Sequence, residues 1–385
     1  MQLQIKTGLL FLCLTKLFSL QGQTLHISLL NETPIKSVII SSLKGPYQII
    51  GDSTLLMTMD SNDAMYITIF EQRLLLRSSQ NPLGNFATIK FVSHDTTGVI
   101  RISCVSPKID SRQYNDNLTL SVAFERILMI NDVQPDNYIA GVVDAEAGPN
   151  AGLEFYKAQS ILVRTYLYGN LDRHITEGFQ LCDGVHCQAY RGRAVRNPII
   201  VQATKATSGY VVMASDSCYI NAVFHANCGG ETESGGNAWL NNKNYLVPVK
   251  DPFCVNSSSA RWTKTISLVQ WKNYLKSHGF KFTADCAPNN FEFSQITRKQ
   301  YYKMERDSIP LRQIRSDFQL KSTFFSVVAN AKEITLKGRG FGHGVGLCQD
   351  GAMYMAKIGY KSNDILKYYF KGIRIVNTGH LVSNK

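Results

Sequence analysis

The 385-residue sequence has no low-complexity tract, no short-period repeat and no recognisable RNA- or DNA-binding motif. The first two absences exclude a largely disordered protein, and 44% hydrophobic with 10% aromatic residues is the composition of a folded one. The net charge of +12 comes from lysine and arginine scattered along the chain. We therefore predict no nucleic-acid partner. The basic residues either form a solvated surface with no specific partner, or they attract an acidic polymer such as an anionic glycan.

The sequence also lacks a phosphate-binding loop, although one stretch is rich in glycine. From Lys337 to Lys357 it reads KGRGFGHGVGLCQDGAMYMAK, with glycine at every second position from Gly338 to Gly346. A dinucleotide fingerprint needs glycines at offsets 0, 2 and 5, and a Walker loop ends in Lys-Ser or Lys-Thr. Neither pattern is present. The stretch instead predicts a strand that bends at several points or lets another backbone approach closely.

The apolar stretch at the N-terminus is too short to span a membrane. The sequence MQLQIKTGLLFLCLTKLFSLQGQT combines a charged start, a short apolar stretch and then small or polar residues, as secretory signals do. We predict a signal peptide at 1–22, export to the periplasm or cell envelope, and no transmembrane helix after cleavage. In that compartment some of the eight cysteines beyond Cys13 are expected to pair as disulfides, with open connectivity.

Two kinds of local pattern divide the rest of the chain. From Thr24 to about Ile130, short segments rich in β-branched residues alternate with Gly, Asn, Asp and Pro, which predicts strands. After Asp136 apolar residues recur at helical spacing, and GPNAG at 148–152 separates two predicted helices. Proline within GPNAG stops the first of them.

Further strands are expected at NPIIVQATKATSGYVVMA and at EITLKG, and two short helices close the chain. Gly359 separates these helices and Ser362 is the expected N-cap of the second. No convincing linker interrupts the pattern. We predict an α+β fold in which a β-rich N-terminal part, 23–130, is interwoven with a two-lobed domain, 131–380, that carries an insert at about 269–322.

Glu146 in VVDAEAGPN is the strongest candidate for a general acid. It lies at the end of an apolar predicted helix, and burial among apolar groups raises the pKa of a carboxyl toward the range that acid catalysis needs. An ordinary exposed glutamate at a helix end is the alternative. Asp144, two positions earlier, does not share a helix face with Glu146, so the two are not a glycosidase carboxylate pair.

The segment HITEGFQLCDGVHCQAY gathers two thiols and two imidazoles, a sufficient set for tetrahedral zinc. The spacing is not that of a standard finger, and adjacent His186 and Cys187 need a sharp turn to ligate together. A Cys182–Cys187 disulfide is the competing interpretation and stays open. The candidate ligands are His174, Cys182, His186 and Cys187.

The segment FHANCGGETESGGNAW places a glycine-rich turn after a short strand. Polar side chains on such a loop often contact a substrate, and a turn with solvated side chains is the alternative. The residues that carry this prediction are Asn227, Glu231, Thr232 and Glu233.

Taken together, four ordered blocks resemble the SpoIID/LytB family of peptidoglycan-processing proteins, related to sporulation stage II protein D. The blocks are YIAGVVDAEAGPNAGLEFYKAQSILVRTYLYGN, HCQAYRG followed by ATKATSGYVV, FHANCGGETES and GRGFGHGVGLCQDGAMYMAKIGY. The last is the family's most specific signature. The resemblance spans most of the mature chain and implies that 131–380 is a SpoIID-type domain.

The resemblance implies lytic transglycosylation of peptidoglycan glycan strands, preferably strands stripped of stem peptides. Glu146 corresponds to the family's catalytic acid and would serve as both acid and base, forming 1,6-anhydro-N-acetylmuramic ends without any cofactor. A rival function is a non-catalytic enhancer of an N-acetylmuramoyl-L-alanine amidase, a role that the family also covers. The residues expected to bind the glycan are Arg164, Tyr190, Asn227, Glu231, Thr232, His343 and Gln349.

The resemblance also bears on the cysteines. Some family members hold a zinc ion just before the Cys-Gln-x-Tyr block, which favours a structural zinc at His174, Cys182, His186 and Cys187. The chain departs from the family pattern at Ala147 and Gly148, and again at Cys348 and Asp350, all near the expected cleft. A Cys228–Cys254 disulfide is a further expectation.

Overall fold

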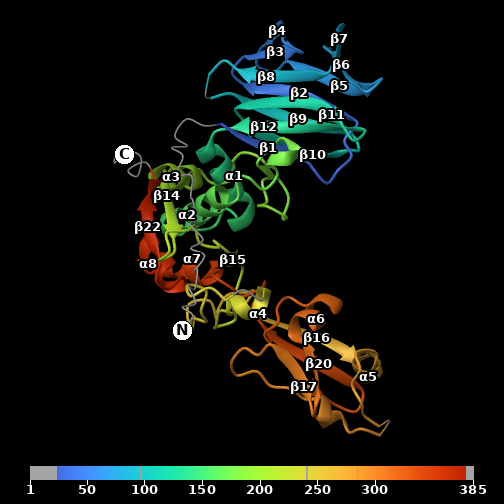
Figure 1. Cartoon of the computed structure of the whole chain (residues 1–385), viewed down its shortest axis with the longest axis vertical. Coiled ribbons are helices and arrows are strands. Elements are labelled where there is room, and N and C mark those ends of the chain that lie inside the picture. Colours follow the sequence, from blue (N-terminus) through green and yellow to red (C-terminus); the bar gives the residue numbers. More distant parts are fainter. Residues whose placement is uncertain (1–23, 96, 240–241, 284, 379–385) are drawn as a thin grey trace, which may run out of the picture.

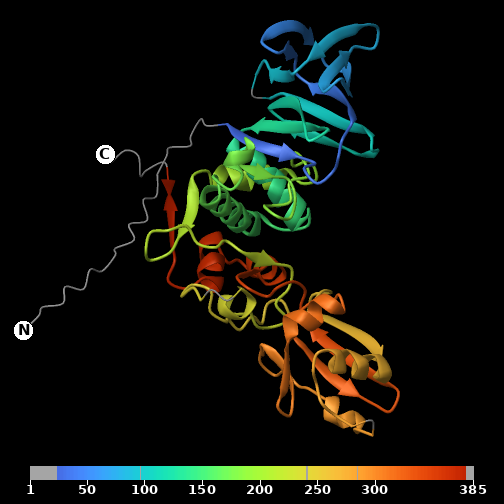
Figure 2. The same ribbon diagram turned by 45° about the vertical axis from the view of Figure 1, so that its right-hand side comes forward.

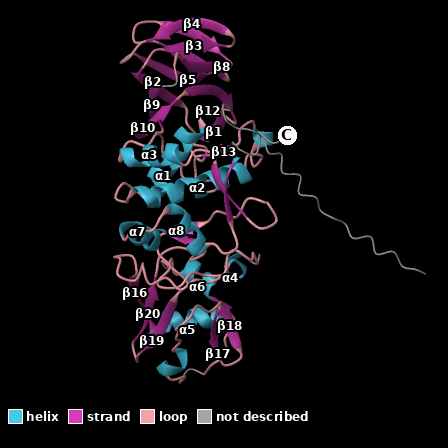
Figure 3. Cartoon of the chain, turned by 90° about the vertical axis from the view of Figure 1, so that its left-hand side faces the viewer, coloured by secondary structure: helices cyan, strands magenta, loops and turns pink. Residues whose placement is uncertain are grey.

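The computed structural model describes residues 24–95, 97–239, 242–283 and 285–378, so the predicted signal peptide at 1–22 lies outside the described residues. The described chain is elongated and has three parts stacked along its length (Figures 1 and 2). A β module forms one end, helices fill the middle, and a smaller lobe of strands and helices forms the other end (Figure 3). The predicted α+β fold is confirmed.

The β module consists of two antiparallel sheets with the strand orders β1-β12-β11-β8-β3-β4 and β10-β9-β2-β5-β6-β7. Alternation along β12 buries every second side chain, as in a sheet with one face on the core. The strands are β1 (Leu25–Leu29), β2 (Ser37–Lys44), β3 (Tyr47–Gly51), β4 (Thr54–Met59), β5 (Ala64–Phe70), β6 (Arg73–Arg77), β7 (Pro82–Phe86), β8 (Thr88–Ser93), β9 (Val99–Ser106), β10 (Ile109–Asn115), β11 (Asn117–Ala123) and β12 (Arg126–Val133).

The helices of the middle part follow the β module without a linker. Helix α1 (Pro135–Ala147) begins two residues after β12 and carries proline at its first position. It ends where Gly148 takes a positive φ, and α2 (Leu153–Gly169) follows the predicted GPNAG break. The short strand β13 (Leu181–Cys182) extends the first sheet beside β1. One hydrophobic core therefore runs from the β module into these helices.

One predicted strand is wrong, because 198–206 forms helix α3 (Pro198–Ala206). The side chain of Asn197 caps it by accepting a hydrogen bond from the N–H of Ile199 at 2.9 Å. An Asn-Pro pair favours a helix start, and here it outweighs the β propensity of the residues that follow. The second half of the predicted segment is a strand, β14 (Tyr210–Met213), paired with β22 (Arg374–Asn377).

The helices α7 (Gln349–Lys357) and α8 (Ser362–Tyr369) confirm the two predicted helices near the C-terminus. The predicted cap of the second is wrong by one residue, since Lys361 is the N-cap and Ser362 is the first helical residue. Among the described residues, no helix combines the length and the apolar character needed to cross a membrane.

The end lobe has a hydrophobic core of its own, centred on the fully buried Trp271. The predicted insert at about 269–322 lies inside this lobe. The lobe consists of the three-stranded sheet β16-β20-β19, the two-stranded sheet β17-β18 and several helices. Its elements are β16 (Arg261–Ser267), α5 (Leu268–Ser277), η2 (Pro288–Phe291), β17 (Tyr301–Met304), β18 (Asp307–Pro310), α6 (Leu311–Asp317), β19 (Phe325–Ala329) and β20 (Glu333–Arg339).

The glycine-rich stretch leads from β20 back to the middle part. Gly340, Gly342, Gly344 and Gly346 all take positive φ values, so the predicted bends are confirmed. A Cβ on Gly346 would lie 2.3 Å from the carbonyl oxygen of Val223. The stretch then enters β21 (Leu347–Cys348), which pairs in parallel with β15 (Phe224–His225). The short helix α4 (Gly235–Trp239) lies in the loop after β15.

The substitution Gly346→Ala is expected to lower the free energy of unfolding by about 3 kcal/mol, because the new Cβ adds a steric clash to left-handed strain. Gly372 is a matched control, since its φ is +63° and a Cβ added there would have no atom within 4 Å. Gly372→Ala should cost about 1 kcal/mol. Urea unfolding compares the two variants. Equal losses would contradict the importance of the close approach to Val223.

Candidate functional site

Glu146 lies in the last turn of α1, where its side chain is half-buried. Its Oε1 accepts a hydrogen bond from the backbone N–H of Ala189 at 3.0 Å. Burial raises the pKa of Glu146, and this outweighs the lowering by that hydrogen bond and by the charge of Arg191. The carboxyl therefore keeps its proton to a higher pH than an exposed glutamate does, as a general acid requires.

Asp144 has a different environment, although it is only two residues away. Its side chain is buried, and its Oδ1 accepts a hydrogen bond from Nε of Arg196 at 3.1 Å. The same guanidinium also bonds to the Asp144 carbonyl oxygen. Asp144 is thus held in an ion pair with Arg196, whereas the carboxyl of Glu146 bonds to a backbone amide.

Gln349 joins the glycine-rich stretch to this helix end. As the first residue of α7, it donates a hydrogen bond from Nε2 to the backbone oxygen of Glu146 at 3.3 Å. This contact helps to satisfy a carbonyl in the last turn of α1, which lacks a partner within the helix. Gln349 therefore fixes the position of the Glu146 backbone.

A groove of about 820 Å³ borders the turn between α1 and α2. Residues 150–154 form one side, and Phe253, Asp350 and Tyr354 belong to its other walls. The rings of Phe253 and Tyr354 are stacked with their centroids 6.3 Å apart. Aromatic surface with a few polar groups is the usual lining of a ligand site. Phe253 and Tyr354 were not predicted from the sequence, since single aromatic residues carry no local signal of a groove.

His343 is held by backbone groups on both sides of its ring. Its Nε2 lies 3.0 Å from the carbonyl oxygen of Phe224, and its Nδ1 accepts the N–H of Val345 at 3.1 Å. Burial lowers the pKa of His343 to about 4, so the imidazole is neutral at physiological pH. In this structure His343 connects the glycine-rich stretch to β15.

Two residues predicted to bind substrate lie in the core instead. Arg164 is completely buried, donating from Nη2 to Asp136 at 2.8 Å and from Nη1 to the Thr207 carbonyl at 2.7 Å. Tyr190 is also completely buried, and its hydroxyl donates to Oδ1 of Asn131 at 2.9 Å. Neither offers surface to a glycan, so this part of the prediction is corrected. Their polar groups instead form hydrogen bonds with other buried polar groups inside the protein.

The residues predicted to bind substrate from the glycine-rich loop after β15 also form contacts within the protein. Asn227 is buried and donates to Asp350 at 2.9 Å. Thr232 is buried and accepts the N–H of Val249 at 2.8 Å. These two side chains support the loop and offer no surface for a glycan, which corrects their predicted role. Glu231 is half-buried beside Lys250, 3.1 Å away, and its role in binding stays a prediction.

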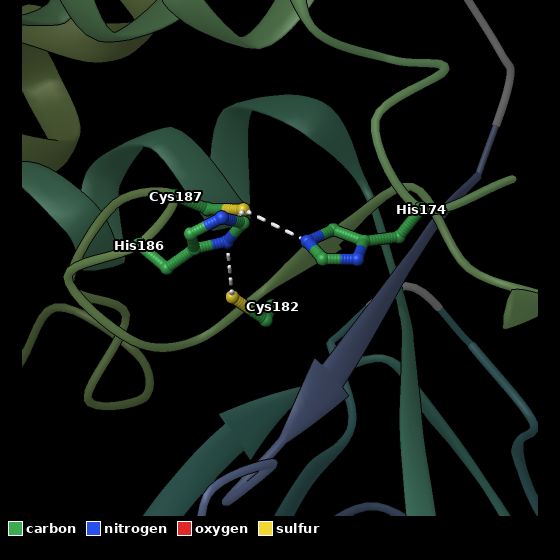
Figure 4. Close-up of side chains that lie close together, drawn as sticks. All are labelled: His174, Cys182, His186 and Cys187. Atoms are coloured by element: carbon green, nitrogen blue, oxygen red, sulfur yellow. Dashed lines mark hydrogen bonds between the residues drawn. The ribbon is translucent and has the colours of Figure 1, made fainter.

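The four predicted metal ligands lie together, with one potential ligand atom from each within 4.8 Å of the others (Figure 4). Cys187 Sγ is 3.4 Å from His174 Nε2 and 3.8 Å from His186 Nδ1. The backbone turns back at this point, since the N–H of Cys187 bonds to the Gly184 carbonyl. That turn lets adjacent His186 and Cys187 face the same centre.

His174 is oriented for coordination, because its Nδ1 bonds to the carboxylate of Glu177 and its Nε2 faces Cys187. His186 Nδ1 faces both thiols. Its Nε2 lies 3.3 Å from Arg173 Nη2, a contact that coordination through Nδ1 would have to release, because a guanidinium only donates. A carboxylate on the remote nitrogen of an imidazole is the usual arrangement behind a metal-ligating histidine. The donor set and its geometry thus fit a tetrahedral zinc ion.

Comparison with known proteins gives a family match over the segment that contains Glu146 and the four predicted metal ligands. Residues 124–213 match the family model described as SpoIID: Stage II sporulation protein. The chain is 28% identical over 267 residues to Stage II sporulation protein D of Bacillus subtilis (strain 168), covering 64% of this chain and 75% of that protein. It is 25% identical over 352 residues to an uncharacterized protein of Brachyspira hyodysenteriae, covering 90% of this chain and 91% of that one.

A further relative is the Amidase enhancer of Bacillus subtilis (strain 168), 24% identical over 296 residues. That match covers 62% of this chain and 40% of the enhancer. The fold and the site define an α+β protein with a half-buried glutamate at the end of α1, inside the segment that the family model matches. The predicted SpoIID/LytB family resemblance is therefore confirmed.

The raised pKa of Glu146 predicts a pH-dependent stability difference between the protein and its Glu146→Gln variant. A carboxyl with a raised folded-state pKa favours folding at low pH, and this contribution is lost as the pH rises through that pKa. Gln stays neutral. We expect equal Tm values near pH 4 and a Tm higher by a few degrees for Glu146→Gln at pH 7.5.

Differential scanning calorimetry across this pH range measures the difference. The exposed Glu292 gives the control, because Glu292→Gln should show no such pH-dependent gain. A Glu146→Gln variant that tracks the unsubstituted protein at every pH would contradict the burial of the charged carboxylate.

Proposed function

We propose that the chain is an exported peptidoglycan lytic transglycosylase that uses Glu146 as its single acid and base. The observation that carries the proposal is the environment of Glu146, a half-buried carboxyl with a raised pKa and a carboxyl oxygen oriented by the Ala189 amide. The substrate is the glycan strand, preferably after removal of its stem peptides.

The reaction needs only one carboxyl group. Protonated Glu146 donates its proton to the glycosidic oxygen next to N-acetylmuramic acid as the bond from that oxygen to C1 breaks. The resulting carboxylate then accepts the proton of the sugar's own 6-hydroxyl while that oxygen bonds to C1, which closes the 1,6-anhydro ring. No water is consumed, and Glu146 ends the cycle protonated again. A second carboxylate, which hydrolysing glycosidases need, is not required.

Three further observations support this proposal. Asp144 is engaged with Arg196, which agrees with a mechanism that has one carboxyl group. The groove beside the turn after α1 offers aromatic and polar surface close to that helix end. The net charge of +12 favours approach to an anionic polymer.

The rival proposal is a non-catalytic enhancer of an N-acetylmuramoyl-L-alanine amidase. It is supported by the similarity to the protein named Amidase enhancer. Both proposals use the same scaffold, and they differ in whether the chain alone changes the glycan.

Glu146→Gln is expected to abolish the release of anhydro-terminated fragments from denuded glycan strands, a loss of at least about 100-fold, because the amide neither donates nor accepts the proton in the required step. Mass spectrometry of the products identifies the anhydro terminus. Circular dichroism checks that the fold is intact, and Glu292→Gln is the surface control.

Two other outcomes decide against the proposal. Full activity of Glu146→Gln would refute the acid role of Glu146. No product from the unsubstituted protein, together with faster cleavage of intact cell wall when an amidase is added, would favour the enhancer.

We also propose that His174, Cys182, His186 and Cys187 hold a structural zinc ion. Four protein ligands fill a tetrahedral sphere and leave no open position for substrate or water. The ion would fix the turn at Gly184 and the segment that leads to Ala189, whose amide orients Glu146.

Cys182→Ser is therefore expected to lower the zinc content by about one ion per chain and to reduce thermal stability. Inductively coupled plasma mass spectrometry counts the metal, with Cys286→Ser as the control outside this cluster. Peptide mapping without a reductant tests the alternative. A Cys182–Cys187 disulfide in the purified protein would exclude the zinc site.

A further inference from the structure

A second cluster of potential metal ligands includes one cysteine from each of the two glycine-rich segments and shares no residue with the zinc site proposed above. It consists of Cys228, Asp251, Cys254 and Cys348, and one potential ligand atom from each lies within 4.8 Å of the others. All four side chains are completely buried. We propose that these residues form a second metal site, with three thiolates and one carboxylate, that binds Zn²⁺.

The distances fit a tetrahedral ion. Ligands at about 2.0–2.3 Å from zinc are separated from each other by roughly 3.3–3.8 Å. Cys228 Sγ lies 3.4 Å from Cys254 Sγ and 3.1 Å from Asp251 Oδ2. Small shifts therefore bring these atoms into coordination. Thiolates are soft ligands that select zinc over calcium or magnesium.

The carboxylate of Asp251 is held in place as metal ligands usually are. Its Oδ2 accepts from the hydroxyl of Tyr369 at 3.0 Å, and its Oδ1 accepts from the N–H of Phe253 at 2.9 Å. Hydrogen bonds of this kind orient a ligand for its ion. The thiol of Cys348 has a similar partner, since its Sγ accepts from the N–H of Cys228 at 3.3 Å.

The charge of the cluster also calls for a cation. Among the described residues, the hydrogen-bond partners of the Asp251 carboxylate are a hydroxyl, a backbone amide and a thiol, and none of these is charged. A buried carboxylate without a cation is costly. A Cys228–Cys254 disulfide would remove the thiol that donates to this carboxylate and would supply no cation in its place. The expected disulfide is not formed in the structure, where all three thiols are free.

The site would connect three segments that are distant in sequence. Cys228 follows β15, Asp251 and Cys254 flank Phe253 of the groove, and Cys348 immediately precedes α7. Gln349, the next residue, contacts Glu146. The ion would therefore hold a wall of the groove and the start of α7 in register. Because four protein ligands would fill the coordination sphere of the ion, its role would be structural.

The experiment counts zinc in the full chain after the first cluster has been removed by Cys182→Ser and Cys187→Ser. We expect about one zinc per chain in this background, and less than about a tenth of that when Asp251→Asn or Cys348→Ser is added. Cys104→Ser is the matched control, a buried cysteine outside both clusters, and should leave the zinc in place. Folded background protein without zinc would overturn the proposal.

Cobalt provides a spectroscopic measure in the same background. The thiolate-to-cobalt absorption of the background protein should have the intensity of a site with three sulfurs, and Cys348→Ser should lose at least about nine tenths of it together with the metal. Unchanged absorption would exclude Cys348 as a ligand.

A measurement on the unsubstituted protein tests the proposal even if the variants fail to fold. In denaturant with a chelator and no reductant, Cys228, Cys254 and Cys348 should react with iodoacetamide as zinc is released. A disulfide would keep Cys228 and Cys254 unmodified until a reductant is added. That result, or zinc release that leaves the three cysteines unmodified, contradicts the proposed site. The outcome is independent of transglycosylase activity.

Discussion

The close approach of two backbone segments organises the part of this protein that carries the candidate site. The stretch from Gly340 to Gly346 passes directly against the segment around β15, and the missing side chains make that distance possible. Gly346 next to Val223 is the tightest point. The pairing of β15 with β21 follows from this contact, and so does the position of α7.

The consequences of this approach extend in two directions. Toward α1, it places Gln349 against the backbone of Glu146. Toward the interior, it brings Cys348 next to Cys228, beside Asp251 and Cys254. The same segment thus supports the proposed acid and the proposed second zinc site. The histidine-cysteine cluster would hold the segment that leads to Ala189, and the cysteine-aspartate cluster would hold the residue before Gln349. Ala189 and Gln349 both contact Glu146.

Much of the architecture was predictable from local pattern. Alternating β-branched segments gave the strands of the β module, and GPNAG separated α1 from α2. Glu146 was identifiable because one short segment carries both the apolar helix and its termination. Helix α3 was missed, since the Asn-Pro start competes with three β-branched residues, and packing of Ile200 and Ala203 decides for the helix.

The sequence alone determined the α+β class, the family resemblance and the candidate acid, because these depend on local composition and on motif order. Only the tertiary structure decided which polar residues face the interior. Arg164 and Tyr190 look like binding residues in the sequence, yet the fold buries both. The structure also gathered Asp251 with three cysteines far apart along the chain. Contacts between segments remote in sequence depend on chain topology, which local patterns do not encode.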